Sequence, residues 1–154
     1  DDTQFERIDI TSLIRGVVQS LEIMAKQKEA DIRMNTQEPV FVWADEFKVE
    51  QVVRNYVSNA LNHVDENRIV DIRIEERDGK IRISVFNTGE PIPEEDIEHI
   101  WEKFYKVDKA RTREYGGNGI GLSIVKAIME SFHQNYGVKN YENGVQFWFE
   151  LDKK

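Results

Sequence analysis

The spacing of apolar residues changes along this chain, and that change is the strongest constraint on its fold. In residues 13–25 and 49–64, apolar side chains recur every three or four positions, the period of an amphipathic helix. From Val70 to Val85 they recur at every second position, the period of a half-buried strand. A helical period returns at residues 124–132. This order predicts an α+β fold.

These patterns predict the positions of individual elements. The predicted helices cover residues 13–25, preceded by Asp9 or Thr11 as N-cap, residues 49–64 and residues 124–132. The strand candidates are residues 32–34, 40–43, 70–74, 81–85 and 145–151, with hairpin turns at Asp78-Gly79 and Asn143-Gly144. We expect a two-layer α/β sandwich, with a mixed, mostly antiparallel sheet of about five strands covered on one face by three helices.

Length and composition restrict the class of protein. The 154 residues contain no dividing linker, so a single domain over residues 1–154 is expected. The 21 basic and 29 acidic side chains leave a net charge of −8, which disfavours nucleic acid and membrane surfaces as partners. The sequence lacks cysteine, which excludes disulfides and thiolate chemistry, and it has no apolar run long enough to span a bilayer.

Four glycines are concentrated in residues 116–121, directly before the third predicted helix. Backbone N–H groups at a helix N-terminus bind anions, and glycine lets the backbone approach a phosphate closely. The Rossmann fingerprint and the P-loop do not fit, because Leu122 stands where the former needs glycine and the latter's Gly-Lys pair is missing. On this segment alone, a phosphate site and a plain flexible loop are both compatible with the sequence.

The second predicted helix has a polar face made of carboxamides. Gln51, Asn55, Asn59 and Asn62 fall within a narrow arc, and His63 lies between this arc and the apolar face. Asparagine costs up to about 0.7 kcal/mol relative to alanine inside a helix, so a compensating role is expected. Carboxamides offer oxygen to a hard cation and N–H to phosphate. A solvated polar face is the alternative interpretation.

Four segments, in the same order along the chain, resemble the signature boxes of sensor histidine kinases. Residues 51–60 resemble the N box, 87–93 the first glycine box, 101–108 the F box and 117–124 the second glycine box. The chain is identified by this resemblance, which runs from about Asp9 to Leu151, as a member of the ATP-binding catalytic domains of two-component kinases. Their superfamily includes DNA gyrase, Hsp90 and mismatch-repair ATPases.

The resemblance implies roles for the matching residues. Asn59 would bind the Mg²⁺ that bridges the ATP phosphates, and Asn55, given the catalytic role, would assist at metal or phosphate. Gly89 would let the backbone approach adenine, and a mobile lid would run from about Trp101 to Gly116. The implied ATP-binding residues are Asn55, Asn59, Asn62, His63, Asn87, Gly89, Ile92, Phe104, Tyr105, Lys106, Arg111, Arg113, Gly117, Asn118, Gly119, Ile120, Gly121 and Leu122.

Three positions depart from the family pattern. Asn87 replaces the aspartate that accepts from the adenine amino group, although an amide also has an acceptor oxygen. Pro91 replaces a glycine and removes one N–H donor. Asn62 replaces a frequent lysine or arginine, while His63 stands where the family carries Tyr or His against the purine. These departures motivate an alternative function, a degenerate non-catalytic module that acts through nucleotide or protein contacts.

The same resemblance distinguishes between two reactions of ATP. Members that hydrolyse ATP carry a glutamate base where this chain has Asn55, and an amide cannot act as a base. An Hsp90-like ATPase is therefore the third hypothesis, after the kinase and the degenerate module. Transfer to a histidine needs mainly a positioned γ-phosphate and Mg²⁺, since the imidazole is the nucleophile. His63, His99 and His133 all lack the sequence context of the family's acceptor histidine.

The sequence therefore predicts an enzyme, the ATP-binding domain of a sensor histidine kinase, with ATP and Mg²⁺ as ligands. It would phosphorylate a histidine on a separate dimerisation domain, from which a response regulator takes the phosphoryl group. Because the chain begins at Asp1 without Met, we expect a piece of a longer protein, with residues 1–8 as the end of a linker. The family further implies a cytoplasmic domain of a membrane-anchored kinase.

Overall fold

The chain folds into two layers, one of which is a mixed sheet. The computed structural model describes residues 2–105 and 121–154, and within them the sheet has seven strands in the order β1-β3-β7-β5-β4-β2, with β6 also paired to β7. The strands are β1 (Glu6–Asp9), β2 (Asp31–Met34), β3 (Phe41–Ala44), β4 (Ile69–Arg77), β5 (Lys80–Thr88), β6 (Tyr136–Tyr141) and β7 (Gly144–Lys153). Strands β2 and β4 are parallel and the other pairs antiparallel, which confirms the mixed, mostly antiparallel sheet.

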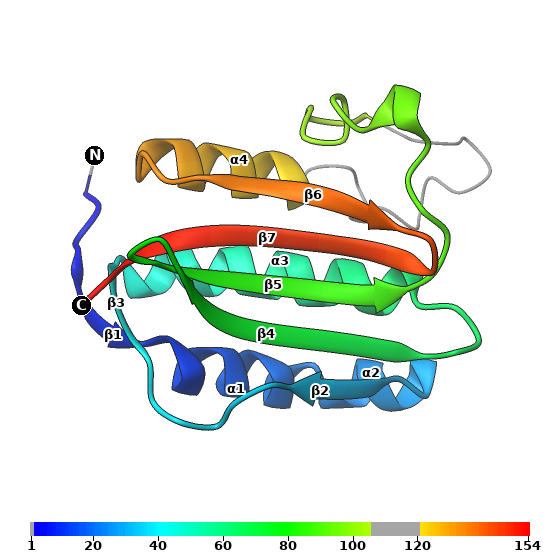
Figure 1. The fold of residues 1–154 in the computed structure, drawn as a ribbon, viewed down its shortest axis with the longest axis horizontal. Coiled ribbons are helices and arrows are strands. Elements are labelled where there is room, and N and C mark those ends of the chain that lie inside the picture. Colours follow the sequence, from blue (N-terminus) through cyan, green and yellow to red (C-terminus); the bar gives the residue numbers. More distant parts are fainter. Residues whose placement is uncertain (1, 106–120) are drawn as a thin grey trace.

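The second layer consists of helices on one face of the sheet. In the view of Figure 1 the α-helices lie behind the strands. They are α1 (Ile10–Ser20), α2 (Glu22–Lys28), α3 (Glu46–His63) and α4 (Gly121–Ser131), with a short 3₁₀ helix η1 (Glu94–Asp96). The predicted two-layer sandwich is confirmed. None of the helices in the described ranges is long and apolar enough to cross a membrane.

The core lies between the layers and follows from the two periods in the sequence. In β4, Val70, Ile72 and Ile74 are buried against the helices while the residues between them face away. In β5 and β7 every second residue is likewise buried against the helices, but Ser84 and Glu150 on the other face are also buried. On α3 the apolar stripe is buried opposite these strands, as its spacing predicts; its members are Val49, Val52, Val53, Tyr56, Val57, Ala60 and Leu61.

The first predicted helix is interrupted, so residues 2–105 and 121–154 contain four α-helices where three were expected. Leu21 leaves helical geometry with φ −101° and ψ 12°, and its N–H is shared between the carbonyls of Val17 and Val18. The Ser20 hydroxyl also bonds to the Val17 carbonyl at 2.7 Å. Local hydrogen bonds of this kind compete with the helical ladder, and the regular helix is interrupted at Leu21 before α2 begins. The apolar spacing continues across the break and does not reveal it.

Two strands were not predicted from alternation, so the expected number of about five is too low. In β1, which includes residues assigned to the end of a linker, only Ile8 is buried. Strand β6 is half-buried along most of its length and contains Gly137. Both are held mainly by backbone pairing, β1 to β3 and β6 to β7. A strand at a sheet edge needs few apolar side chains, so its sequence signal is weak.

The two hairpin turns give one confirmation and one correction. Asp78 and Gly79 connect β4 to β5 with φ values of 52° and 80°, the left-handed conformations of a type I′ turn. Between β6 and β7 the turn residues are Glu142 and Asn143, one position earlier than predicted. Gly144 is already the first residue of β7, where a Cβ would lie 2.2 Å from the Asn87 carbonyl oxygen.

Candidate functional site

Helix α3 carries the carboxamide face, and its start is fixed by a side-chain cap. Asp45 accepts hydrogen bonds from the backbone N–H of Lys48 at 3.0 Å and of Gln4 at 2.9 Å. Burial raises the pKa of Asp45, but these hydrogen bonds outweigh it and hold the pKa below its ordinary value. The cap therefore carries a negative charge at the positive end of the helix dipole. It sets where α3 begins and so which residues form each face.

Asn59 is the buried member of this face. Its exposed fraction is 2%, whereas Asn55, Asn62 and His63 are half-buried along the same side of α3. Within the described residues, neither the amide oxygen nor the amide nitrogen of Asn59 has a hydrogen-bond partner. An unsatisfied buried polar group costs about 1–3 kcal/mol. An amide in this position fits a site that receives a cation or a phosphate from outside the chain.

The end of β5 lies directly beside the end of α3. At Gly89, a Cβ would come within 2.7 Å of the His63 carbonyl oxygen, so the two elements approach more closely than any side chain permits. Asn87 is 2% exposed, and its amide nitrogen donates to the Thr88 carbonyl at 3.1 Å. This bond fixes the side chain with its nitrogen turned to the backbone. Acceptance by the amide oxygen of Asn87 from the adenine amino group stays a prediction.

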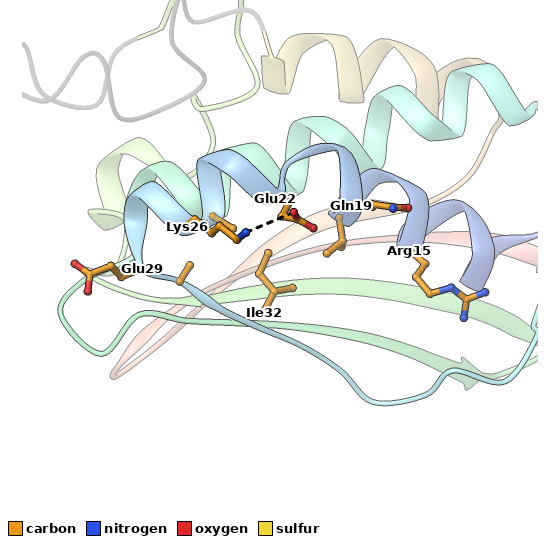
Figure 2. Close-up of a pocket in the computed structure, with 9 residues that line it drawn as sticks. Arg15, Gln19, Glu22, Lys26, Glu29 and Ile32 are labelled. Atoms are coloured by element: carbon orange, nitrogen blue, oxygen red, sulfur yellow. Dashed lines mark ion pairs between the residues drawn. The ribbon is translucent and has the colours of Figure 1, made fainter.

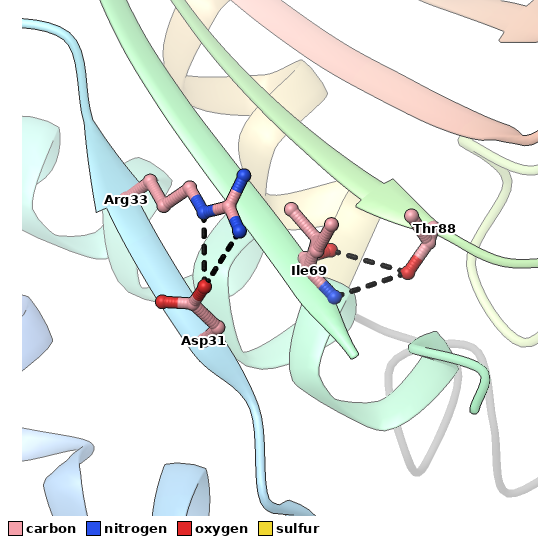
Figure 3. Close-up of polar contacts among 4 residues, drawn as sticks. All are labelled: Asp31, Arg33, Ile69 and Thr88. Carbon is pink, nitrogen blue, oxygen red and sulfur yellow. Dashed lines mark hydrogen bonds and ion pairs between the residues drawn. The ribbon is translucent and has the colours of Figure 1, made fainter. Parts of the chain in front are cut away.

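Thr88 is a residue of this region that the sequence analysis did not single out. Its hydroxyl contacts the backbone N–H and C=O of Ile69 at 3.1 and 3.4 Å (Figure 3). Its carbonyl accepts from the N–H of Asp65, just after α3, at 3.0 Å. Thr88 thereby joins the start of β4, the end of β5 and the end of α3. A single threonine after an alternating strand gives no sequence signal for such a role.

The segment after β5 is attached to β6 and β7. The backbone of Ile92, which is buried, forms two hydrogen bonds with the Asn140 side chain of β6, at 2.9 and 2.7 Å. Trp101 packs edge-on against Tyr136 and Phe147, with ring centroids 4.9 and 5.8 Å apart. The stretch from Ile92 to Tyr105 therefore has a defined position beside the ends of β5 and β6.

The two predicted F-box residues differ in environment. Tyr105 is half-buried, and its hydroxyl donates to the buried carboxylate of Asp96. Phe104 is 61% exposed and has a positive φ of 67°, which is unfavourable for a bulky residue. Of the two, Tyr105 is the one anchored by contacts of its side chain.

Helix α4 begins at Gly121, as the glycine-rich turn predicts, and packs against α3. Leu122 is buried in its first turn. The remaining predicted residues of the turn and of the lid lie outside the described residues; they are Lys106, Arg111, Arg113, Gly117, Asn118, Gly119 and Ile120. The structure thus joins the end of β5 to the end of α3, packs α4 beside α3, and attaches the segment to Tyr105 to β6 and β7.

A groove of about 670 Å³ lies elsewhere, between β2 and the helices α1 and α2 (Figure 2). Its floor is apolar and includes Val18, Ala25 and Ile32, while charged side chains such as Arg15 and Glu22 line its rim. The residues implied by the family resemblance do not line this groove. We therefore locate the candidate site at the carboxamide face of α3.

Comparison with known sequences decides the family. The sequence profile of the histidine kinase-, DNA gyrase B-, and HSP90-like ATPases matches residues 44–154. The chain belongs to this family. Within it, this is a catalytic ATP-binding domain of the sensor histidine kinase type, because the similar curated proteins include sensor histidine kinases. The family predicted from the four boxes is confirmed.

Two bacterial kinases illustrate the similarity in sequence. The chain is 36% identical to sensor histidine kinase WalK of Bacillus subtilis over 134 aligned residues. The aligned region covers 84% of this chain and 22% of WalK. The chain is 27% identical over 154 residues to the phosphate regulon sensor protein PhoR of Haemophilus influenzae, covering 99% of the chain and 36% of PhoR. The histidine kinase domain thus spans between a fifth and two fifths of these relatives.

Solved structures agree in fold. The nucleotide-free catalytic domain of histidine kinase ThkA superposes with a TM-score of 0.82 at 33% identity, covering 97% of this chain and 96% of that one. Full-length ShkA in complex with AMPPNP gives a TM-score of 0.85 at 26% identity, covering 100% of this chain and 32% of ShkA. ThkA in complex with the response regulator TrrA gives 0.81 at 32% identity, covering 99% and 42%.

Proposed function

We propose that this histidine kinase domain binds ATP with Mg²⁺ and transfers the γ-phosphoryl group to a histidine outside residues 1–154. The acceptor would lie on the dimerisation domain of the same kinase, and a response regulator would then take the phosphoryl group. The domain would work in the cytoplasm, in a protein anchored to the membrane by other segments. The observation that carries the proposal is Asn59, a buried amide without a hydrogen-bond partner in the described part of the chain.

The cost of Asn59 is the argument for a ligand. Asparagine is unfavourable in a helix interior, and burial of its unpaired amide adds about 1–3 kcal/mol. Leucine at the same position would continue the apolar stripe of α3 at no such cost. A cation or a phosphate that binds this amide supplies the missing interaction, and Asn55, one turn earlier on the same face, would contribute a second amide oxygen.

The other candidate residues divide into a base side and a phosphate side. Asn87, Gly89 and Ile92 would receive the purine together with Asn62 and His63. The start of α4 at Gly121 would face the phosphates with its N–H groups, together with the preceding glycines and the cations Lys106, Arg111 and Arg113. When bound, Mg²⁺ neutralises charge on the phosphate oxygens, which favours attack by an external nucleophile.

Asn55 favours transfer over hydrolysis. A carboxylate at this position could take a proton from water, but an amide has no basic site near neutral pH. The imidazole of a histidine needs no such base because its nitrogen attacks directly. The AMPPNP complex of ShkA and the ThkA–TrrA complex support the choice of nucleotide and of the regulator.

The first experiment measures nucleotide binding. A fluorescent ATP analogue is titrated with Mg²⁺ into the wild type, Asn59→Ala and Asn135→Ala, the last being an exposed asparagine after α4. We expect saturable binding for the wild type and the control and at least tenfold weaker binding for Asn59→Ala. If the wild type does not bind at millimolar concentration, the degenerate module becomes the better description.

The second experiment tests the reaction. The domain is mixed with ATP labelled at the γ-phosphate and with the dimerisation domain of its parent kinase. We expect an acid-labile, base-stable label on the dimerisation domain with the wild type. With Asn59→Ala, the dimerisation domain should stay unlabelled. Nucleotide binding without any labelled histidine would contradict the kinase assignment for this chain.

A further inference from the structure

Four side chains after β5 form a row, and of these the family resemblance gave a role to Tyr105 alone. The backbone from Pro93 to Tyr105 makes four consecutive hydrogen bonds between residues three apart. Asp96 N–H donates to Pro93 O, His99 to Asp96, Glu102 to His99 and Tyr105 to Glu102, at 2.8–3.2 Å. Only Glu94–Asp96 forms a regular 3₁₀ helix, and Phe104 has a left-handed φ of 67°. The row is therefore defined by the contacts between its side chains.

The side chains of this row contact one another. The ring of His99 stacks on that of Tyr105 with centroids 5.1 Å apart and an interplanar angle of 23°. The Tyr105 hydroxyl donates to Asp96, which is only 7% exposed. The Nδ1 atom of His99 lies 2.7 Å from a carboxylate oxygen of Glu102. Tyr105 is thus held at its hydroxyl by one residue and on its ring by another.

The frame behind the row is rigid. Ile100 is 6% exposed, and Trp101 packs against Tyr136 of β6 and Phe147 of β7. These contacts attach the segment to β6 and β7 through residues other than those of the row. We therefore expect a change of charge within the row to act on Tyr105 while the segment stays attached.

We propose that Asp96, His99 and Glu102 are positioning residues that hold Tyr105, and that this arrangement, the Tyr105 clasp, is tightest when His99 is protonated. A protonated imidazole can hydrogen-bond to Glu102 through Nδ1 and form an ion pair with Glu98, whose carboxylate oxygen lies 3.6 Å from Nε2. A neutral imidazole keeps one N–H and leaves the neighbouring carboxylates uncompensated. The ring of His99 is then held less firmly against Tyr105.

The acidic side chains around His99 favour its protonated form. The hydrogen bond with Glu102, together with the charges of Glu102, Glu98 and Asp96, raises the pKa of His99 despite an opposing effect of burial. On the neighbouring strand β6, the cation Lys139 is directed to the ring of Tyr141, 5.1 Å away. Protonation of His99 therefore stabilises the clasp below its ordinary pKa, and this contribution is lost as pH rises through the raised value.

The effect of the clasp on nucleotide affinity rests on the proposed function, because it requires that Tyr105 belongs to the nucleotide site. We expect the affinity for Mg·ATP to fall several-fold as pH rises through the titration of His99. The hydroxyl of Tyr105 remains a donor throughout, because its bond to Asp96 raises the pKa of Tyr105 to about 12. His99 is the group in the row whose protonation changes near neutral pH.

The test follows the rings directly. The NMR signals of His99 and Tyr105 are recorded against pH in the wild type, Glu102→Gln and His99→Gln. We expect the Tyr105 signals to follow the titration of His99, the titration midpoint to fall in Glu102→Gln, and the pH response of Tyr105 to vanish in His99→Gln. If the Tyr105 signals do not change over the pH range in which His99 titrates, the proposed clasp is wrong, whether or not nucleotide binds.

Nucleotide affinity gives the functional readout. The dissociation constant of Mg·ATP is measured over the same pH range for the wild type, His99→Gln and the control His133→Gln, an exposed histidine after α4. His133→Gln should follow the wild type and His99→Gln should lose the pH dependence. Asp96→Asn, which keeps an acceptor, should retain affinity that Asp96→Ala loses. A wild type that binds no nucleotide would refute the proposed function while the NMR coupling still decides the clasp.

Discussion

Two residues of the candidate site, Asn59 and Gly89, also affect the stability of the fold. Asn59 lowers it, whereas Gly89 is needed for it. Asn59 buries an amide that has no partner within the described residues. Gly89 allows the end of β5 to approach the His63 carbonyl oxygen. A substitution at each position should therefore change the free energy of unfolding, and for Asn59 this change can be compared with the change in nucleotide binding.

Replacement of Asn59 by leucine should increase stability while it abolishes binding. The substitution removes an unpaired buried amide and extends the apolar stripe of α3, so we expect the free energy of unfolding to rise by about 1 kcal/mol. Urea denaturation measures this change, and the nucleotide titration measures the loss of binding. Lower stability together with intact binding would show that the amide has its partners within the protein.

Gly89→Ala should destabilise the protein through a single methyl group. Its Cβ would lie 2.7 Å from the His63 carbonyl oxygen, so either α3 or the end of β5 must move, at a cost of about 1–3 kcal/mol. The matched control is Gly16→Ala in α1, where a Cβ meets nothing within 4 Å. That control should gain about 0.5–1 kcal/mol from helix propensity. Equal effects in thermal unfolding would contradict the close contact.

At the scale of elements, α3 depends on its cap because the cap fixes which residues form the carboxamide face. Asp45→Ala removes the acceptor for the N–H of Lys48 and Gln4, and we expect a loss of about 1 kcal/mol in the free energy of unfolding. Asp45→Asn keeps an acceptor oxygen and should lose much less at neutral pH. Chemical denaturation of both variants distinguishes the cap from a general effect of substitution at this position.

The elements also show how far the sequence could predict the structure. Strands β4, β5 and β7 carry apolar residues at every second position because one face of each packs on the helices, and Asp78-Gly79 specifies its turn through two left-handed residues. The break at Leu21 leaves the apolar spacing intact, so the spacing does not reveal it. Strands β1 and β6 are held by backbone pairing, which has little sequence signal.

The candidate site was predictable to a similar extent. Residue type and spacing selected the face of α3 and the glycines before α4. They did not distinguish Asn59, which is buried, from the half-buried Asn55 and Asn62 on the same face. That difference depends on what packs against each turn of the helix. The contacts of Thr88 with Ile69 and Asp65 join segments far apart in the sequence and have no local signature.

At the scale of the whole molecule, acidification should lower stability. Hydrogen bonds outweigh burial to lower the pKa of Asp45 and Asp65, and the bond to Lys80 lowers that of Asp152. Their stabilising contributions are present above the unfolded pKa of about 4 and are lost as pH falls through the lower folded values. Urea denaturation from about pH 7 to pH 3 should show this decline, with a smaller decline for Asp45→Asn. Constant stability over this range would contradict it.

The position of β7 has a consequence for the order in which the protein acquires its structure. The last strand of the chain lies inside the sheet, paired with β5 along its length and also with β3 and β6. While the polypeptide is being synthesised, β3 and β5 therefore expose unpaired backbone edges until residues 144–153 have left the ribosome. Unpaired strand edges favour aggregation, and the sheet is completed by one late, long-range pairing of β7 with β3 and β5.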